Sequence, residues 1–364
     1  MGLFLTAKPW LSRVKNYEPG KPLEELEREY GIRDAVKMAS NENALGPSPK
    51  ALEAVRKALP RIHRYPEGGC YYLRKALAKR LCVAPESLVF GNGSDEILVF
   101  AVRAFVGQES EVIIADPTFL IYQIAAEVEN ARVIQVPMKD FRYDLDGMAD
   151  RIGEKTRLIF IANPDNPVGT YSSQKKLEAF LKRVPAGVLV VLDEAYYEFA
   201  SARKDYPESL KLLKSYPNLL VTRTFSKAYG LSGLRVGYGI AAAEVTAALN
   251  KVREPFNVNL LAQVAACAAL GDGAHLRKTQ KLVDEGRRYL EGEFGKLKLR
   301  TVKTATNFVL ADLGSDAKTV YEKLLRRGVI VRPMGVWGLP SFIRVTIGKP
   351  EENRRFVKAL KELQ

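Results

Sequence analysis

Lys227 is the residue of this sequence with the clearest chemical potential. It stands among small hydroxyl residues in the stretch Thr222–Tyr238, and Arg235 follows eight positions later. Apolar and aromatic side chains fill most of the remaining positions, so we expect the amine to be desolvated. A buried charged lysine is costly unless it is neutral or chemically used. Such lysines form Schiff bases with carbonyl compounds; a surface lysine before a loop is the structural alternative.

A second group of candidates lies in Gly91–Glu96, where a strand-like run passes into a helix. Two glycines allow the backbone to approach a ligand closely, and the first N–H groups of the helix point toward it. Gly93, Ser94 and Asp95 therefore predict a phosphate site. A plain helix cap at Ser94 or Asp95 would explain the same residues.

Four further side chains follow other strand-like runs. Phe119 suits a stacking ring or a core position, and Asn166 lies in an Asn-Pro-Asp-Asn-Pro run that favours a rigid turn. Asp193 ends an apolar run and needs a cationic partner if it is buried. Tyr196 follows three residues later. With Lys227 and a phosphate site, these groups are the parts that pyridoxal phosphate requires.

The elements that position these residues alternate between about residues 87 and 240. Near-continuous apolar strands separated by helices indicate a largely parallel sheet covered on both faces. Ligands of such sheets bind at the carboxyl ends of the strands, where the candidates lie. The predicted strands are Leu88–Phe90, Glu111–Ala115, Val133–Val136, Leu158–Ala162, Val188–Leu192, Leu219–Thr222 and Val236–Ile240. The predicted helices include Asp95–Val106, Phe119–Glu129, Lys175–Val184 and Glu208–Ser215.

The predicted fold class is α/β, with a seven-stranded, mostly parallel sheet in a large domain and a smaller α+β domain. A helical stretch from 242 to 269, broken at Pro255, leads into mixed strands and helices. We expect three parts: an N-terminal arm (1–37) that packs on the small domain or a partner subunit, the large domain (38–255) and the small domain (256–364).

Composition argues against several functional classes. The net charge is +14, but basic and acidic residues are interspersed at helical spacing, which disfavours a nucleic-acid partner. The three cysteines show no paired spacing and the two histidines are isolated, so we expect neither disulfides nor a metal site. No apolar run reaches the roughly 18 residues of a membrane span, and no secretory signal is recognisable at the N-terminus. We expect a cytoplasmic protein.

Seven segments, in order along nearly the whole chain, resemble the fold-type I pyridoxal-phosphate-dependent aminotransferases, and more closely the histidinol-phosphate aminotransferases. Spacing between Asp193 and Lys227 is specific for the superfamily, whereas the Asn-Glu-Asn and Arg-Tyr-Pro segments point to the subfamily. Ala44 departs from the family, which usually has proline there. The segments are Ala39–Pro49, Arg64–Gly69, Gly91–Glu96, Asn163–Gly169, Asp193–Tyr196, Thr224–Arg235 and Phe342–Gly348.

This resemblance implies a role for each residue around the cofactor ring. Lys227 would bind the cofactor covalently and then act as the general base that moves a proton. Asp193 would keep the pyridine nitrogen protonated. Asn166 and Tyr196 would hydrogen-bond the phenolate oxygen, and Phe119 would stack on the ring.

Roles at the two anion sites follow in the same way. Tyr65 would reach the cofactor phosphate from the neighbouring subunit, so the active unit would be a homodimer. Arg344 matches the arginine that binds a substrate carboxylate, and Arg332, Tyr17 and Asn43 are further candidate substrate contacts. The phosphate ligands within the chain would be Gly93, Ser94, Asp95, Thr224, Ser226 and Arg235.

The implied reaction is a ping-pong transamination of histidinol phosphate with 2-oxoglutarate, giving imidazole-acetol phosphate and glutamate, in histidine biosynthesis. An aromatic amino-acid aminotransferase stays open, because it needs only one carboxylate site and an apolar pocket. Threonine-phosphate decarboxylation would share the same cofactor site. A dinucleotide-binding oxidoreductase is disfavoured because no GxGxxG motif follows the first strand.

Overall fold

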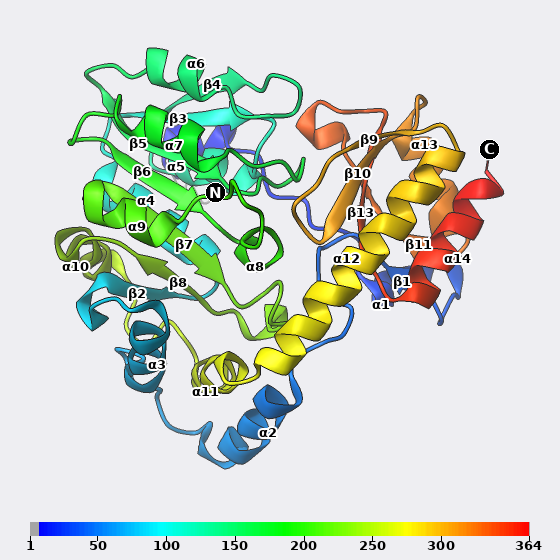
Figure 1. Ribbon diagram of the computed structural model, residues 1–364, viewed down its shortest axis with the longest axis horizontal. Helices are drawn as coiled ribbons and strands as arrows, with labels where there is room; N and C mark the ends of the chain where they lie inside the picture. Colours follow the sequence, from blue (N-terminus) through cyan, green and yellow to red (C-terminus); the bar gives the residue numbers. More distant parts are fainter. Residues whose placement is uncertain (1–6, 364) are drawn as a thin grey trace, which may run out of the picture.

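A seven-stranded sheet forms the core of the larger part of the structure, a computed structural model that describes residues 7–363 (Figure 1). The strand order is β2-β8-β7-β6-β5-β3-β4, and only β8 runs antiparallel to its neighbours. The strands are β2 (Leu88–Gly91), β3 (Glu111–Asp116), β4 (Arg132–Pro137), β5 (Thr156–Ala162), β6 (Leu189–Asp193), β7 (Leu219–Thr224) and β8 (Gly237–Ile240). The seven predicted strands and the mostly parallel sheet are therefore confirmed.

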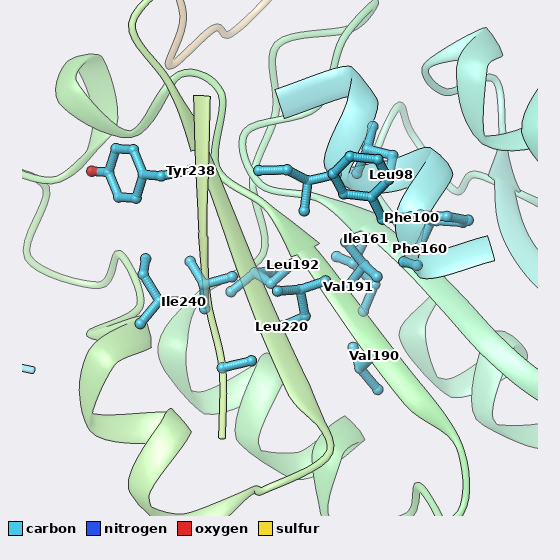
Figure 2. Close-up of a cluster of buried hydrophobic side chains, with 14 of the residues drawn as sticks. Leu98, Phe100, Phe160, Ile161, Val190, Val191, Leu192, Leu220, Tyr238 and Ile240 are labelled. Carbon is cyan, nitrogen blue, oxygen red and sulfur yellow. The ribbon is translucent and has the colours of Figure 1, made fainter. Parts of the chain in front are cut away.

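Most strands of this sheet are buried because they consist largely of apolar residues. Every residue of β2, β6, β7 and β8 is buried, because helices cover both faces of the sheet. Figure 2 shows Leu98 and Phe100 of helix α4 (Ser94–Phe105) in one cluster with Phe160 and Ile161 of β5. Burial of each large apolar side chain contributes about 1.5–3 kcal/mol, so the sheet is a rigid support for the loops at its edge.

The helices around this sheet match the predicted ones within a few residues. The stretch predicted from 242 to 269 is two helices separated by residues 253–259, because Pro255 cannot continue a helix and Asn259 caps the second one. Helices α3, α6 and α8 were not predicted. The set is α2 (Pro49–Ala58), α3 (Tyr71–Leu81), α4, α5 (Leu120–Val128), α6 (Leu145–Asp150), α7 (Gln174–Leu181), α8 (Tyr197–Ala200), α9 (Ser209–Ser215), α10 (Ala243–Val252) and α11 (Leu260–Leu270).

The C-terminal part is built on a second, antiparallel sheet of order β12-β13-β10-β9, seen to the right in Figure 1. The long helix α12 (Gly273–Lys296) and helix α14 (Pro350–Lys361) pack with this sheet around their own apolar cluster. The remaining elements are β9 (Arg300–Val302), β10 (Phe308–Asp312), α13 (Ala317–Leu325), β12 (Arg332–Pro333), η5 (Gly335–Trp337) and β13 (Phe342–Thr346). A short parallel pair joins β1 (Val36–Lys37) to β11 (Val329–Ile330).

The N-terminal segment touches both parts. The turn η1 (Pro9–Arg13) lies against α5, where Trp10 Nε1 donates to the carbonyl of Val128 at 3.0 Å. Helix α1 (Leu23–Tyr30) packs against the C-terminal part, where Leu26 lies in an apolar cluster with Leu325. The exact division of the chain at 37/38 and 255/256 stays a prediction, and residues 1–6 of the predicted arm lie outside the described part. Within residues 7–363, no helix is both long and apolar enough to cross a membrane.

Candidate active site

Lys227 lies in a pocket between the two sheets, at the carboxyl ends of the parallel strands. Its Nζ donates to the backbone carbonyl of Ser40 at 3.3 Å and lies 5.9 Å from the centre of the Tyr196 ring. Burial, followed by the positive charge of Arg344, lowers the pKa of Lys227 from 10.5 to about 8. The neutral, nucleophilic form of the amine is therefore far more abundant near neutral pH than for an ordinary lysine, although it is still the minor form.

Asp193 supplies a carboxylate at the end of β6 and is 4% exposed. Tyr122 donates its hydroxyl to Oδ2 at 2.8 Å, and Thr222 donates to Oδ1 at 3.0 Å. Burial raises the pKa of Asp193 to about 6, although both hydrogen bonds oppose the rise. Among residues 7–363 it forms no salt bridge, so a buried negative charge faces the pocket without a cation.

An anion cradle stands at the start of α4. Gly93 has φ +90°, and a Cβ at this position would collide with the guanidinium of Arg235. Arg235 itself adopts the left-handed region at φ 57°, an uncommon conformation for a residue with a side chain. Its Nη1 lies 3.4 Å from Ser226 Oγ. Hydroxyls, a guanidinium and the free N–H groups of the helix therefore converge on one space, as phosphate binding requires.

A second anion site is formed by two arginines of the smaller sheet. Arg332 and Arg344 are direct register partners on β12 and β13, and both are nearly buried. The centre of the Trp337 ring lies 5.3 Å from Arg332 and 5.8 Å from Arg344. Like charges opposite each other on paired strands are destabilising, so an anion between them would relieve the repulsion.

Hydrogen bonds leave part of this second site open. Arg344 donates to the carbonyl of Ala39 at 3.0 Å and to Asn166 Oδ1, while Arg332 donates to the carbonyl of Glu18 at 2.6 Å. Within the described part of the chain, the Nε of Arg344 is buried and has no hydrogen-bond partner. Such a donor is costly to leave unpaired, which favours a ligand here.

Tyr196, Asn166 and Phe119 line the pocket between the two anion sites. The hydroxyl of Tyr196 accepts from Asn41 Nδ2 at 2.9 Å, and burial raises its pKa, so it stays protonated and can donate. Asn166 accepts from Arg344 through Oδ1, which leaves its NH2 group for a ligand. Phe119 packs edge-on against Tyr122, with ring centres 5.6 Å apart.

The structure brings most of the predicted site residues together, and three of them do not line the pocket. Gly93 lies directly behind it, against Arg235. Asn43 instead donates to the carbonyl of Ala228 at 2.9 Å and so supports the backbone next to Lys227. The lining residues among those predicted are Tyr17, Ser94, Asp95, Phe119, Asn166, Asp193, Tyr196, Thr224, Ser226, Lys227, Arg235, Arg332 and Arg344.

Tyr65 lies outside its own chain's pocket. It is 85% exposed and stacks on Phe256, with ring centres 4.9 Å apart. Its predicted role lies in the pocket of a neighbouring subunit, and this role stays a prediction because the structure contains one chain.

Sequence reasoning missed four contacts of the site. Thr222 lies on β7 in register with Asp193, and Tyr122 follows Phe119 by three positions on a helix, so strand pairing and helical spacing could have indicated both. Asn41 binds Tyr196 across the chain, and Trp337 lies in a 3₁₀ turn between two strands. Asn41 belongs to the Asn-Glu-Asn segment recognised above, but its contact with Tyr196 was not predicted, and no local pattern marks Trp337, because tertiary packing alone makes these contacts.

Comparisons with known proteins agree with this arrangement. A family profile described as aminotransferase class I and II matches residues 33–360. The chain is 50% identical over 351 residues to the histidinol-phosphate aminotransferase of Moorella thermoacetica, covering 96% of this chain and 91% of that protein. It is 45% identical to histidinol-phosphate aminotransferase 2 of Carboxydothermus hydrogenoformans, covering 96% and 97%.

Solved structures agree as well. The histidinol-phosphate aminotransferase of Sinorhizobium meliloti, in complex with pyridoxal 5′-phosphate, is similar with a TM-score of 0.91 and 30% identity, covering 100% of this chain and 99% of that one. The expected fold-type I architecture is confirmed. By profile, sequence and structure, the chain belongs to the aminotransferase class I and II family.

Proposed function

We propose that this protein is a pyridoxal-phosphate-dependent aminotransferase that transfers the amino group of histidinol phosphate to 2-oxoglutarate. The products are imidazole-acetol phosphate and glutamate, as in histidine biosynthesis. One observation carries the proposal: a single pocket joins the amine of Lys227, the uncompensated carboxylate of Asp193 and the guanidiniums of Arg332 and Arg344. Relatives named for this activity match 96% of the chain, which supports the choice of substrate.

The residues present fit the cofactor at both ends. The missing side chain of Gly93 leaves Arg235 and the start of α4 facing one space, which suits a phosphate dianion. Asp193 would meet the protonated ring nitrogen and thereby gain the cation that it lacks. Phe119 would cover one face of the ring, and the NH2 of Asn166 and the hydroxyl of Tyr196 would donate to the phenolic oxygen.

In the proposed mechanism, pyridoxal phosphate, when bound, would supply an aldehyde reactive toward amines and a ring that stabilises negative charge. Lys227 would hold the cofactor through its amine, and its free amine would remove the proton from the substrate Cα as a general base. Its lowered pKa makes the basic form of the free amine far more abundant near neutral pH than it is for an ordinary lysine. Asp193 stabilises positive charge on the ring nitrogen, which draws the electron pair inward.

The arginine pair favours a substrate with a strongly anionic group remote from the amine. Histidinol phosphate presents a phosphate, and glutamate presents two carboxylates, so both suit two adjacent guanidiniums. An aromatic amino acid carries a single carboxylate, whose one negative charge balances only one of the two guanidiniums. Arg332 and Arg344 therefore support the first choice over the aromatic aminotransferase.

The active unit is proposed to be a homodimer in the cytoplasm. The segment around Tyr65 exposes several aromatic and apolar side chains, among them Tyr72, which is 77% exposed, and Ile62, which is 64% exposed. A partner covering this face would bury them and bring Tyr65 to its own cofactor phosphate. Sedimentation of the purified protein should give a dimer, and Tyr65→Phe should weaken cofactor binding while the dimer remains.

The cofactor assignment is tested with Lys227→Ala. The purified wild type should be yellow and lose its colour on borohydride reduction, with one reduced adduct mapped to Lys227 by mass spectrometry. The variant should lose about 10²–10⁴-fold or more in kcat, the range of a missing general base. Lys281→Ala, at an exposed position, is the matched control and should be unaffected. Full turnover by Lys227→Ala would refute the assigned role.

The substrate assignment is tested by comparing kcat/KM for histidinol phosphate and phenylalanine, each with 2-oxoglutarate. The kcat/KM for histidinol phosphate should be the higher one, and Arg332→Gln should reduce the ratio of the two kcat/KM values. A preference for phenylalanine would favour the aromatic aminotransferase. Release of carbon dioxide from threonine phosphate would point to the decarboxylase instead.

A further inference from the structure

Asp165 is a buried acid that the proposed mechanism does not use. It immediately precedes Asn166 and is 0% exposed, yet it does not line the pocket. Its Oδ2 accepts from Thr118 Oγ1 at 2.7 Å and from the Tyr143 hydroxyl at 3.1 Å, and its Oδ1 accepts from the N–H of Val168 at 3.1 Å. Within residues 7–363 it forms no salt bridge.

These bonds tie together loops that each present a residue to the pocket. Thr118 precedes Phe119, and the Tyr143 hydroxyl accepts from the N–H of Ala162 at the end of β5 at 3.1 Å. The carbonyl of Thr118 also accepts from Trp337 Nε1 at 2.9 Å. A continuous chain of hydrogen bonds therefore runs from the Asn166 loop, through Asp165, to the aromatic wall beside the arginine pair.

A carboxylate is the side chain that satisfies this arrangement. Two hydroxyls, those of Thr118 and Tyr143, which lie 2.6 Å from each other, approach one oxygen, and a backbone N–H, which can only donate, approaches the other. Asparagine offers a single acceptor oxygen: turned toward the hydroxyls, it places its NH2 group against the Val168 N–H, and turned toward that N–H, it requires Thr118 and Tyr143 to accept instead of donate. The carboxylate is nevertheless costly, because burial raises the pKa of Asp165 to about 7. A buried carboxylate kept at this desolvation cost indicates that its hydrogen bonds are needed to hold the loops in position.

We propose that Asp165 is a positioning residue that fixes Phe119 and Asn166 around the ring site and couples them, through Thr118, to Trp337 and the arginine pair. The proposal rests on the function proposed above for the ring site. Asp165 touches neither substrate nor cofactor. It acts by holding the Asn166 amide with its oxygen toward Arg344 and its NH2 group toward the pocket.

The test compares Asp165→Asn with Asp205→Asn. The control removes a carboxylate that also accepts from a tyrosine hydroxyl, that of Tyr171 at 2.6 Å, but at an exposed position outside the pocket. Asp165→Asn should weaken pyridoxal-phosphate binding to the cofactor-free protein by about tenfold, the factor of one lost buried hydrogen bond. The control should bind as the wild type does. Equal affinity in all three proteins would overturn the proposal.

The coupling to the smaller sheet has its own readout. Trp337→Phe keeps a ring beside the arginines but removes the N–H that reaches Thr118. It should raise KM for histidinol phosphate, with kcat changed less, and its effect should shrink in the Asp165→Asn background because the link is already loosened. Strictly additive effects would contradict the coupling, since independent sites add. Thr118→Val serves as the milder variant if Asp165→Asn fails to fold.

Hydrogen exchange separates a failure of this proposal from a failure of the proposed function. In the cofactor-free protein, Asp165→Asn should speed amide exchange at residues 118–119 and at the non-proline residues of 162–168, relative to Asp205→Asn. If the wild type bound no pyridoxal phosphate, the proposed function would fall, and faster exchange would still support the positioning role. Unchanged exchange in these segments would reject it whatever the cofactor does.

Discussion

Asp193 and Glu194 are consecutive buried acids at the end of β6, and they face opposite surroundings. Glu194 is 0% exposed and meets a cation: Arg223 Nη2 lies 2.8 Å from its Oε2, and Ser209 Oγ donates to the same oxygen at 3.0 Å. Arg223 also lies 3.4 Å from the centre of the Tyr197 ring. Asp193 faces the pocket and, among the side chains of residues 7–363, accepts from the neutral hydroxyls of Tyr122 and Thr222.

The difference separates a structural charge from a functional one. On the Glu194 side the protein supplies the opposite charge itself, so that region is complete without a ligand. On the Asp193 side the charge is oriented by two donors but left without a cation, at the desolvation cost that raises its pKa. Adjacent residues of similar chemistry thus identify where a cationic ligand belongs.

The largest expected effect lies on the Glu194 side. Arg223→Met removes the cation and leaves Glu194 buried without a partner, so the unfolding free energy should fall by about 3–5 kcal/mol. Urea unfolding of the cofactor-free protein measures it. The double variant Glu194→Leu with Arg223→Met should recover much of this loss, because the orphaned charge is gone. If Arg223→Met were as stable as the wild type, the ion pair between Glu194 and Arg223 would have no structural role.

Asp193→Asn should have the reverse profile. Losing the charge opposite the ring nitrogen should lower kcat by about 10²–10³-fold, as for other preorganised electrostatic contacts. The unfolding free energy should fall far less than in Arg223→Met, because the amide is uncharged and both hydroxyls can donate to it or accept from it. Steady-state kinetics and urea unfolding of the same preparation decide the matter. If Asp193→Asn lost much of its unfolding free energy but kept its kcat, Asp193 would be a structural charge, contrary to the comparison with Glu194.

A smaller effect concerns the pH at which Lys227 captures the cofactor. The reactive form is the neutral amine, and the pKa of Lys227 is lowered to about 8, so the capture rate should rise with pH through a midpoint near 8. Burial is the main cause and Arg344 the next, so Arg344→Gln should shift the midpoint upward. Arg344→Lys keeps the charge and should shift it less. Stopped-flow absorbance gives the three midpoints, and a common value would exclude Arg344 as a cause.

Residues at strand ends were predictable because sheet topology determines where they meet. Asp193, Lys227 and Asn166 follow apolar runs in the sequence, and parallel strands bring such positions to one edge. Asn43 shows the limit: its segment was recognised, but its amide supports Ala228 and does not enter the pocket. A polar side chain's direction depends on the packed backbone around it.

Contacts between the two sheets could not be predicted from the sequence, for a different reason. Trp337 and the bond between Arg332 and the carbonyl of Glu18 depend on how the N-terminal segment and the smaller sheet pack against α5. The hydrogen-bonded chain through Asp165 likewise joins residues that are distant in sequence. Helix α3 was missed because it carries exposed aromatic residues, Tyr71 and Tyr72, that obscure its apolar face.

The central claim, that Asp193 is held ready for a cationic ligand, can be tested on one carboxyl group. Carbon-13 NMR of aspartate-labelled protein, with Asp193→Asn for assignment, would follow its titration with and without pyridoxal phosphate. Without the cofactor, the midpoint should lie near 6 because burial raises the pKa of Asp193. With the cofactor, the opposite charge should lower the pKa, so the group should stay ionised to distinctly lower pH. An identical midpoint in both states would contradict the account.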